Sequence, residues 1–148
     1  MRRGQTCSIA AVLILVLCAP NLHAEKPILI KVTAIVASNQ GTDIDLENDA
    51  HRDQLIKLFS YSAYKQVSES SVSLSDASES AVSIPGEYQF SLKLLGEMGN
   101  QVLIRATIEK GGKRVLDTRV SLLGSSPLFL GGPPFDSGNL IIVIERLS

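Results

Sequence analysis

Three consecutive segments in the second half of the chain alternate apolar with polar residues, which is the period of a β-strand with one buried face. The alternation is unbroken from Glu87 to Leu94, and it recurs from Gln101 to Glu109 and from Arg114 to Leu122. Between the last two segments, Lys110-Gly111-Gly112-Lys113 has the paired glycines of a tight hairpin turn. This region therefore predicts an antiparallel sheet that shows one face to water.

The first half of the chain predicts a strand and then a helix. Residues Ile28 to Val36 alternate with the period of a strand. A helix is predicted from about Asn48 to Phe59, because acidic residues at its start suit the positive end of a helix dipole and offer caps. Its expected apolar stripe is Leu55, Leu58 and Phe59, with Ile56 beside it.

Residues 60–83 contain ten serines in 24 positions, a composition that also fits a disordered linker. Within this segment Val72 and Leu74 alternate with serines, and Val82 and Ile84 alternate with small residues. Short, half-exposed strands with serine facing outward are therefore favoured.

The C-terminal part combines a glycine and proline segment with an apolar run. Gly131-Gly132-Pro133-Pro134 is expected to interrupt regular structure after a strand at Pro127 to Leu130. The run Leu140 to Ile144 is apolar at every position, which predicts a central strand buried on both faces. The predicted fold class is α+β: a mostly antiparallel β sheet or sandwich of about eight strands with one helix near the N-terminus.

Residues 1–24 have the order of residues of a secretory signal peptide. Arg2 and Arg3 precede an apolar stretch from Ile9 to Ala19, and a small-residue site ends at Ala24. The apolar stretch is well short of the roughly twenty residues that span a bilayer, so a permanent anchor is the weaker alternative. We expect residues 25–148 to form a single mostly-β domain that is periplasmic or secreted, without a membrane span.

The composition after residue 24 excludes several classes of function. Both cysteines, Cys7 and Cys18, lie in the predicted signal, which leaves no thiol for a disulfide, a metal site or a nucleophile. Lipid attachment at Cys18 remains an alternative to cleavage. The remaining 124 of 148 residues suit one domain, and their 12 basic against 15 acidic residues provide no basic footprint for nucleic acid.

No catalytic or cofactor signature stands out in the remaining chain, so we expect neither an enzyme nor a bound cofactor. His51 would lie one turn before Leu55, where a surface or half-buried histidine is favoured over a catalytic one. No serine sits in a Gly-x-Ser-x-Gly elbow. An enzyme would require His51, Asp45, Asp49 and a serine to converge in one pocket.

Alternating acids before the predicted helix resemble the start of a calcium loop. They are Asp43, Asp45, Glu47 and Asp49. Counted from Asp43, position six is Asn48 rather than glycine and position twelve is Gln54 rather than glutamate, so the sharp turn and the bidentate ligand are missing. Helix capping is therefore favoured over metal binding, and no metal ligand is predicted.

The segment Gly131, Gly132, Pro133, Pro134 and Phe135 is the predicted partner-contact site. It lacks the lysine and the following helix of a phosphate-binding loop. A structural role, with Phe135 folded back onto the core, is favoured over a rigid contact loop with an aromatic at its tip.

Part of the chain resembles a known family. Thr118 to Leu122, Gly124 and Pro127 to Gly132 are similar to the strand, turn, strand and Gly-Gly pattern of the secretin domain of bacterial outer-membrane secretion pores. The chain after residue 24 also resembles small exported bacterial proteins of unknown function. The resemblance implies a place in an envelope assembly rather than a self-sufficient pore, because 124 residues are too few for the other parts of a secretin.

These observations favour a soluble, exported, non-enzymatic domain that binds another envelope protein. Strand addition at an exposed sheet edge or docking at the Gly131 to Gly138 segment is the expected mode. The alternative is a carrier of a small apolar ligand, suggested by the many Ile, Leu and Val residues and by the room between the layers of such a fold.

The signal assignment predicts the N-terminus of the exported protein. Edman sequencing or intact mass should show a chain that begins at Glu25, because Ala24 ends the small-residue site. An intact Met1, or a lipid on Cys18, would contradict the assignment.

Overall fold

The computed structural model describes residues 26–76 and 78–147, so the predicted signal at 1–24 lies outside the described residues. It contains nine strands and one helix in this part of the chain. In order these are β1 (Ile28–Ser38), β2 (Ile44–Asp45), α1 (Asp49–Leu58), β3 (Ala63–Leu74), β4 (Glu79–Ile84), β5 (Tyr88–Met98), β6 (Gln101–Lys110), β7 (Lys113–Leu123), β8 (Leu128–Phe135) and β9 (Gly138–Leu147).

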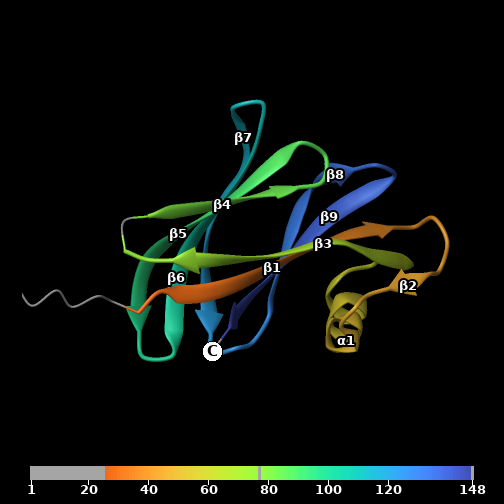
Figure 1. Cartoon of the computed structure of the whole chain (residues 1–148). Coiled ribbons are helices and arrows are strands. Elements are labelled where there is room, and N and C mark those ends of the chain that lie inside the picture. The colour runs from red at the N-terminus through yellow and green to blue at the C-terminus, as the bar shows by residue number, and fades with distance from the viewer. Residues whose placement is uncertain (1–25, 77, 148) are drawn as a thin grey trace, which may run out of the picture.

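The strands form two sheets that pack face to face as a sandwich (Figure 1). Sheet A has the order β2-β3-β1-β9-β8, and sheet B has the order β4-β5-β6-β7. All pairs are antiparallel except the short contact between β2 and β3. The α+β, mostly antiparallel prediction is confirmed, and the two-residue strand β2 is an addition to the strands that the pattern predicts.

The main core lies between the two sheets and is built from the alternating residues of the sequence. On β5 and β6 the buried residues are Phe90, Leu92, Val102, Ile104, Ala106 and Ile108. The hairpin between β6 and β7 turns at Gly111 and Gly112, both at positive φ, which glycine adopts without steric strain. The inward faces and the hairpin predicted from the alternation are therefore confirmed.

Strand β9 is central in sheet A and is buried on both faces, as its apolar run predicts. Leu140, Ile142 and Ile144 belong to the core between the sheets. Ile141 and Val143 belong to a second, smaller core on the outer face of sheet A. The neighbouring strand β1 repeats the arrangement, because Ile30 faces the sandwich core and Ile35 the second core.

Helix α1 covers part of the outer face of sheet A (Figure 1). Asn48 is its N-cap, and the side chain accepts a hydrogen bond from the Ala50 amide at 3.0 Å. At the other end the buried Tyr64 hydroxyl donates to the carbonyl of Leu55 at 3.2 Å and lies 3.0 Å from that of Phe59. This hydroxyl ties the end of the helix to β3.

The predicted apolar stripe of the helix is only partly right. Leu55 is fully buried and Phe59 packs against the second core, but Leu58 is 61% exposed and Ile56 is 49% exposed. The buried positions are His51 and Leu55, four residues apart. A helix of this length touches the sheet along one narrow stripe, which leaves Leu58 outside it.

The expectation that Gly131-Gly132-Pro133-Pro134 interrupts regular structure is wrong. These residues belong to β8, which pairs with β9 through a register shift between Gly131 and Pro134. Strand β8 is an edge strand, so a proline without an N–H is tolerated on its unpaired side. The serine-rich segment is also more regular than expected, because β3 runs without a break for 12 residues.

Three charged or titratable groups meet beneath α1. Lys31 and Glu145 are opposite each other on β1 and β9, with 2.9 Å between the Lys31 Nζ and a Glu145 carboxylate oxygen. His51 reaches down from the helix, is 2% exposed, and places Nε2 3.2 Å from the other oxygen of Glu145. Burial raises the pKa of Glu145, but its hydrogen bonds and charge pairing with Lys31 and His51 outweigh burial and lower it overall. The contact between His51 and Glu145 thus joins the helix to the sheet in addition to apolar packing.

We predict that Glu145→Gln weakens the dependence of stability on acid. Since the pKa of Glu145 is lower in the folded than in the unfolded chain, its ionised form stabilises the fold above the ordinary value of 4.5. That contribution disappears as the pH falls below 4.5 and through the lower folded value. Denaturant titrations across this pH range should show a smaller loss in the variant than in the wild type.

Glu47→Gln is the matched control at an exposed glutamate, and Glu145→Gln should lose less stability on acidification than this control does. An identical acid dependence in wild type and Glu145→Gln would contradict the prediction.

Candidate interaction surface

The outer face of sheet B is not covered by any other described element, and one end of it is apolar. Alternate residues of β5, β6 and β7 point away from the core, and near one end these residues are large hydrophobics. Leu95, Met98, Leu103 and Leu123 form this apolar end. Met98 is 80% exposed and Leu123 is 63% exposed, whereas a folded chain gains free energy by burying such side chains. A contiguous exposed apolar group of this kind is a candidate for contact with another molecule.

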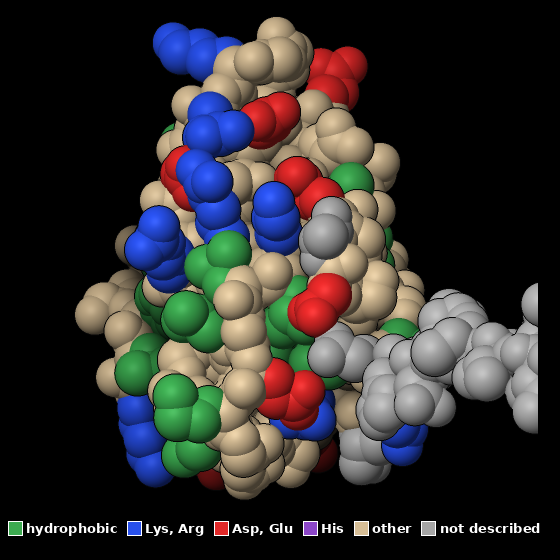
Figure 2. Space-filling model, turned by 90° about the vertical axis from the view of Figure 1, so that its left-hand side faces the viewer, with side chains coloured by type: hydrophobic (Ala, Val, Ile, Leu, Met, Phe, Trp, Pro, Cys, Tyr) green, Lys and Arg blue, Asp and Glu red, His purple; other side chains and the backbone are tan. Residues whose placement is uncertain are grey.

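A row of cations crosses the same face next to the apolar end. Lys93, Arg105 and Arg119 lie directly opposite one another on the adjacent strands β5, β6 and β7. Figure 2 shows Lys and Arg side chains gathered beside hydrophobic ones on this side of the molecule. Like charges at directly opposed positions destabilise a sheet unless acidic neighbours compensate them.

Only the middle of the cation row is neutralised by a close ion pair. Arg105 donates two hydrogen bonds to the carboxylate of Asp117, at 2.8 and 2.6 Å. These bonds, together with the nearby Arg114, hold the pKa of Asp117 at about 2. Arg119 forms no ion pair with any residue that the structure describes. Lys93 lies directly opposite Glu79 of β4, so Arg119 is the residue of the row whose positive charge is available for an acidic group.

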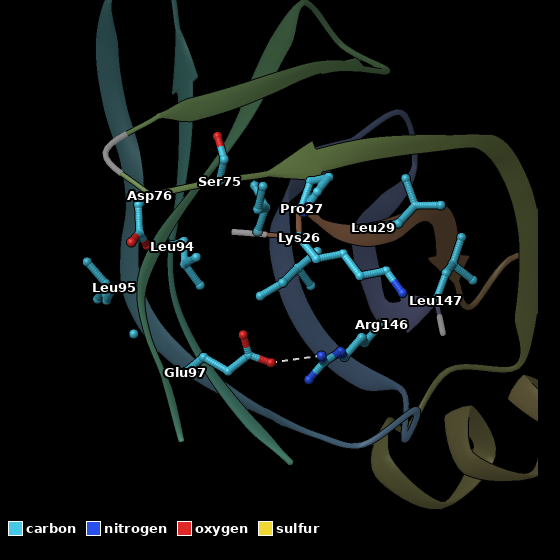
Figure 3. A pocket seen from close by; sticks show the side chains of 13 residues that line it. Lys26, Pro27, Leu29, Ser75, Asp76, Leu94, Leu95, Glu97, Arg146 and Leu147 are labelled. Atoms are coloured by element: carbon cyan, nitrogen blue, oxygen red, sulfur yellow. Dashed lines mark hydrogen bonds and ion pairs between the residues drawn. The ribbon is translucent and has the colours of Figure 1, made fainter. Parts of the chain in front are cut away.

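A cleft of about 930 Å³ opens beside the apolar end, at one end of the sandwich. Its walls come from both sheets, and Figure 3 shows the side chains around it. Arg146 of β9 and Glu97 of β5 form an ion pair of 2.8 Å in this cleft, which links the two sheets. Ile28, Leu29, Leu74, Leu94 and Leu147 supply apolar surface, and Lys26, Asp76, Glu97 and Arg146 supply charge. The cleft thus has a mixed character and suits an amphipathic group.

The cleft and the apolar end are continuous through β5. A register shift between Leu94 and Gly96 leaves Leu95 as an extra residue in this strand. Leu95 and Gly96 line the cleft, and Gly96 is also beside Met98 in a second, shallower hollow. The bulge therefore joins two accessible surfaces at one place.

The residues predicted to contact a partner lie elsewhere, on edge strand β8. Gly132 packs closely on β9, because a Cβ there would lie 2.9 Å from the Leu140 carbonyl oxygen. Phe135 is half-buried and packs against the sandwich core, next to Gly86 and Tyr88. The Tyr88 hydroxyl donates to the Pro134 carbonyl at 3.1 Å. The segment thus joins the two sheets, and a role in partner contact remains a prediction.

The groups weighed for catalysis and calcium binding do not converge. His51 is buried under α1 against Glu145, whereas Asp45 and Asp49 are exposed. Across residues 26–76 and 78–147, no three His, Cys, Asp or Glu residues come together as a metal site. Within the same residues, no helix is both long and apolar enough to cross a membrane.

The cation row and the apolar end were not predicted from the sequence. The hydrophobic residues Leu103 and Leu123 occupy outward positions in predicted strands or at their ends, and this exception to the alternation was the available signal. The cation row was harder to predict from the sequence, because Lys93, Arg105 and Arg119 are seen to be neighbours only when the strand register is known.

Comparison of the chain with protein-family models, with curated proteins and with solved structures finds no match. The fold of the described part of the chain is a two-sheet β sandwich in which one helix covers part of the outer face of sheet A.

We predict that Phe135→Ala lowers the free energy of unfolding by about 1–3 kcal/mol, less than the usual loss for a fully buried phenylalanine. The reason is that the ring is only half-buried, between Gly86 and Tyr88. Chemical denaturation should show a lower midpoint at an unchanged slope. Leu58→Ala, at an exposed helical position, is the control and should change stability little. An unchanged midpoint for Phe135→Ala would instead indicate a contact role.

Proposed function

We propose that this protein is an exported, non-enzymatic interaction domain that binds another envelope protein on the outer face of sheet B. The observation that carries the proposal is the cation row of Lys93, Arg105 and Arg119 beside the apolar end. The apolar end is exposed in the isolated chain, Arg119 has no ion pair among the described residues, and the two features lie side by side. Export is supported by the signal-like order of residues 1–24.

The chemistry of this face defines the partner that fits it. Exposed leucines and Met98 suit apolar side chains of a partner, and methionine adapts to irregular surfaces. The cation row suits carboxylates, and arginine is well matched to them through paired hydrogen bonds. A partner segment with apolar residues followed by acidic residues therefore complements the face. Such charge complementarity speeds association and makes it sensitive to salt.

A second candidate function is the binding of a small molecule in the cleft between the sheets. The volume of about 930 Å³ is within the range of ligand pockets. The ion pair of Arg146 and Glu97 in the cleft favours an amphipathic ligand over a wholly apolar one, because a charged pair needs polar neighbours. Native mass spectrometry of protein from its host distinguishes the two functions, since a carrier retains a bound small molecule.

We predict that Leu103→Asp and Lys93→Ser each reduce the recovery of a partner by about tenfold, the effect expected at a central contact. The measurement is affinity capture from an envelope extract, with wild type and variants compared by quantitative mass spectrometry. Binding to the wild type should also weaken as salt is raised, because the cation row contributes charge.

Leu58→Asp is the control, since Leu58 is also an exposed leucine, at 61% on α1 against 40% for Leu103, and it should leave partner recovery unchanged. Circular dichroism verifies that all variants remain folded. Capture that is the same for wild type, Leu103→Asp and Lys93→Ser would refute the proposed surface, and so would the absence of any protein above background.

A further inference from the structure

The free edge of β7 is the best template for strand pairing among the described edges. Both sheets end in unpaired backbone groups, which attract another strand unless they are protected. On sheet A, the edge strand β2 has two residues, and β8 carries Pro133 and Pro134. On sheet B, β4 has six residues, with Ser80 bonded to the Ser73 carbonyl of β3 at 2.7 Å. Strand β7 has 11 residues and no proline.

Features that discourage pairing with another strand occur at only one end of β7. A register shift between Ile108 and Glu109 leaves Val115 as an extra residue near the hairpin. From Leu116 to Leu123 the pairing with β6 is regular. The inward positions of this stretch are Leu116, Thr118, Val120 and Leu122, so no inward-pointing charge blocks an incoming strand.

The sequence of this stretch is complementary to itself in the antiparallel direction. If Thr118 lies opposite Thr118 of a second copy, Asp117 lies opposite Arg119 of that copy, and Leu116 lies opposite Val120. A two-fold axis repeats both contacts. Opposite charges and apolar pairs at opposed positions stabilise a sheet. Arg119, which has no ion pair in the described part of the chain, then gains an acidic neighbour, an Asp117 that also pairs with Arg105 and Arg114 of its own chain.

The neighbouring symmetric registers lack this complementarity. If the two-fold axis passes through Arg119, the two Arg119 residues lie opposite each other, and if it passes through Asp117, the two Asp117 residues do. Both arrangements oppose like charges, which destabilises a sheet. A register that differs by one residue puts inward against outward positions and is excluded by the alternation of the strand. Only the register centred on Thr118 pairs unlike charges.

We propose that a second copy of this chain pairs with β7 in antiparallel fashion about Thr118, so that two four-stranded sheets become one continuous eight-stranded sheet. The contact is a single pair of edge strands, which makes the dimer small and reversible. This inference concerns the edge of sheet B rather than its outer face, and Arg119 at that edge is the residue that it shares with the cation row.

A symmetric disulfide tests the register directly. The two Thr118 Cα atoms are expected about 4.5–5.5 Å apart, within the span of a disulfide. In a full-length chain carrying Cys7→Ser and Cys18→Ser, no other thiol is present. Thr118→Cys should then form a covalent dimer under mild oxidation, to an extent that rises with protein concentration.

Ser121→Cys is the matched control on the same strand. In the proposed register Ser121 faces Val115 of the other copy, so two cysteines at 121 would be about 20 Å apart and should not join. A third variant, Thr118→Cys with Arg119→Glu, places acids opposite acids and should lower the yield of covalent dimer about tenfold.

Circular dichroism and the unfolding midpoint establish that each variant is folded. Folded Thr118→Cys that stays monomeric under oxidation would overturn the proposal, as would equal cross-linking of Thr118→Cys and Ser121→Cys. An undiminished yield with Arg119→Glu would overturn the charge pairing on which the register depends.

Discussion

The burial of β9 on both faces is the constraint on which the rest of the structure depends. Its alternate residues fill two different cores, Leu140, Ile142 and Ile144 on one side and Ile141 and Val143 on the other. A strand can be apolar on both faces only if each face is covered, so β9 requires sheet B beneath it and helix α1 with its flanking loops above it. Its pairing with both β1 and β8 satisfies its backbone groups, which burial makes necessary.

Sheet B meets the opposite condition. One of its faces completes the core, and the other is left to solvent, so its outward residues are not required for folding. This freedom permits the cation row and the exposed apolar end on the outer face. The outward charges of β7 also alternate in sign. Its edge contains no proline, whereas the edge strand β8 contains Pro133 and Pro134. Sheet A is covered on both faces in part, whereas sheet B is covered on one face only.

The parts that could be predicted from the sequence are those set by neighbours along the chain. The inward faces of β5 to β7, the glycine turn at Gly111 and Gly112, and a capped helix that starts near Asn48 all follow from local spacing and side-chain chemistry. The prediction failed at β8, where glycines and prolines indicated an interruption, because an edge strand tolerates residues that a central strand does not. It failed also at Leu58, since which helical stripe is buried depends on the sheet below it.

The sequence by itself determined which residues face inward, that two glycines close a hairpin, and that one strand must be central. These properties depend on periods of two or three to four residues, which are visible in any short window. Only the tertiary structure decided which outward residues become neighbours. Lys93, Arg105 and Arg119 form a row, and Glu97 meets Arg146, because bulges, turns and the stacking of two sheets set the alignment of segments that are distant in the chain.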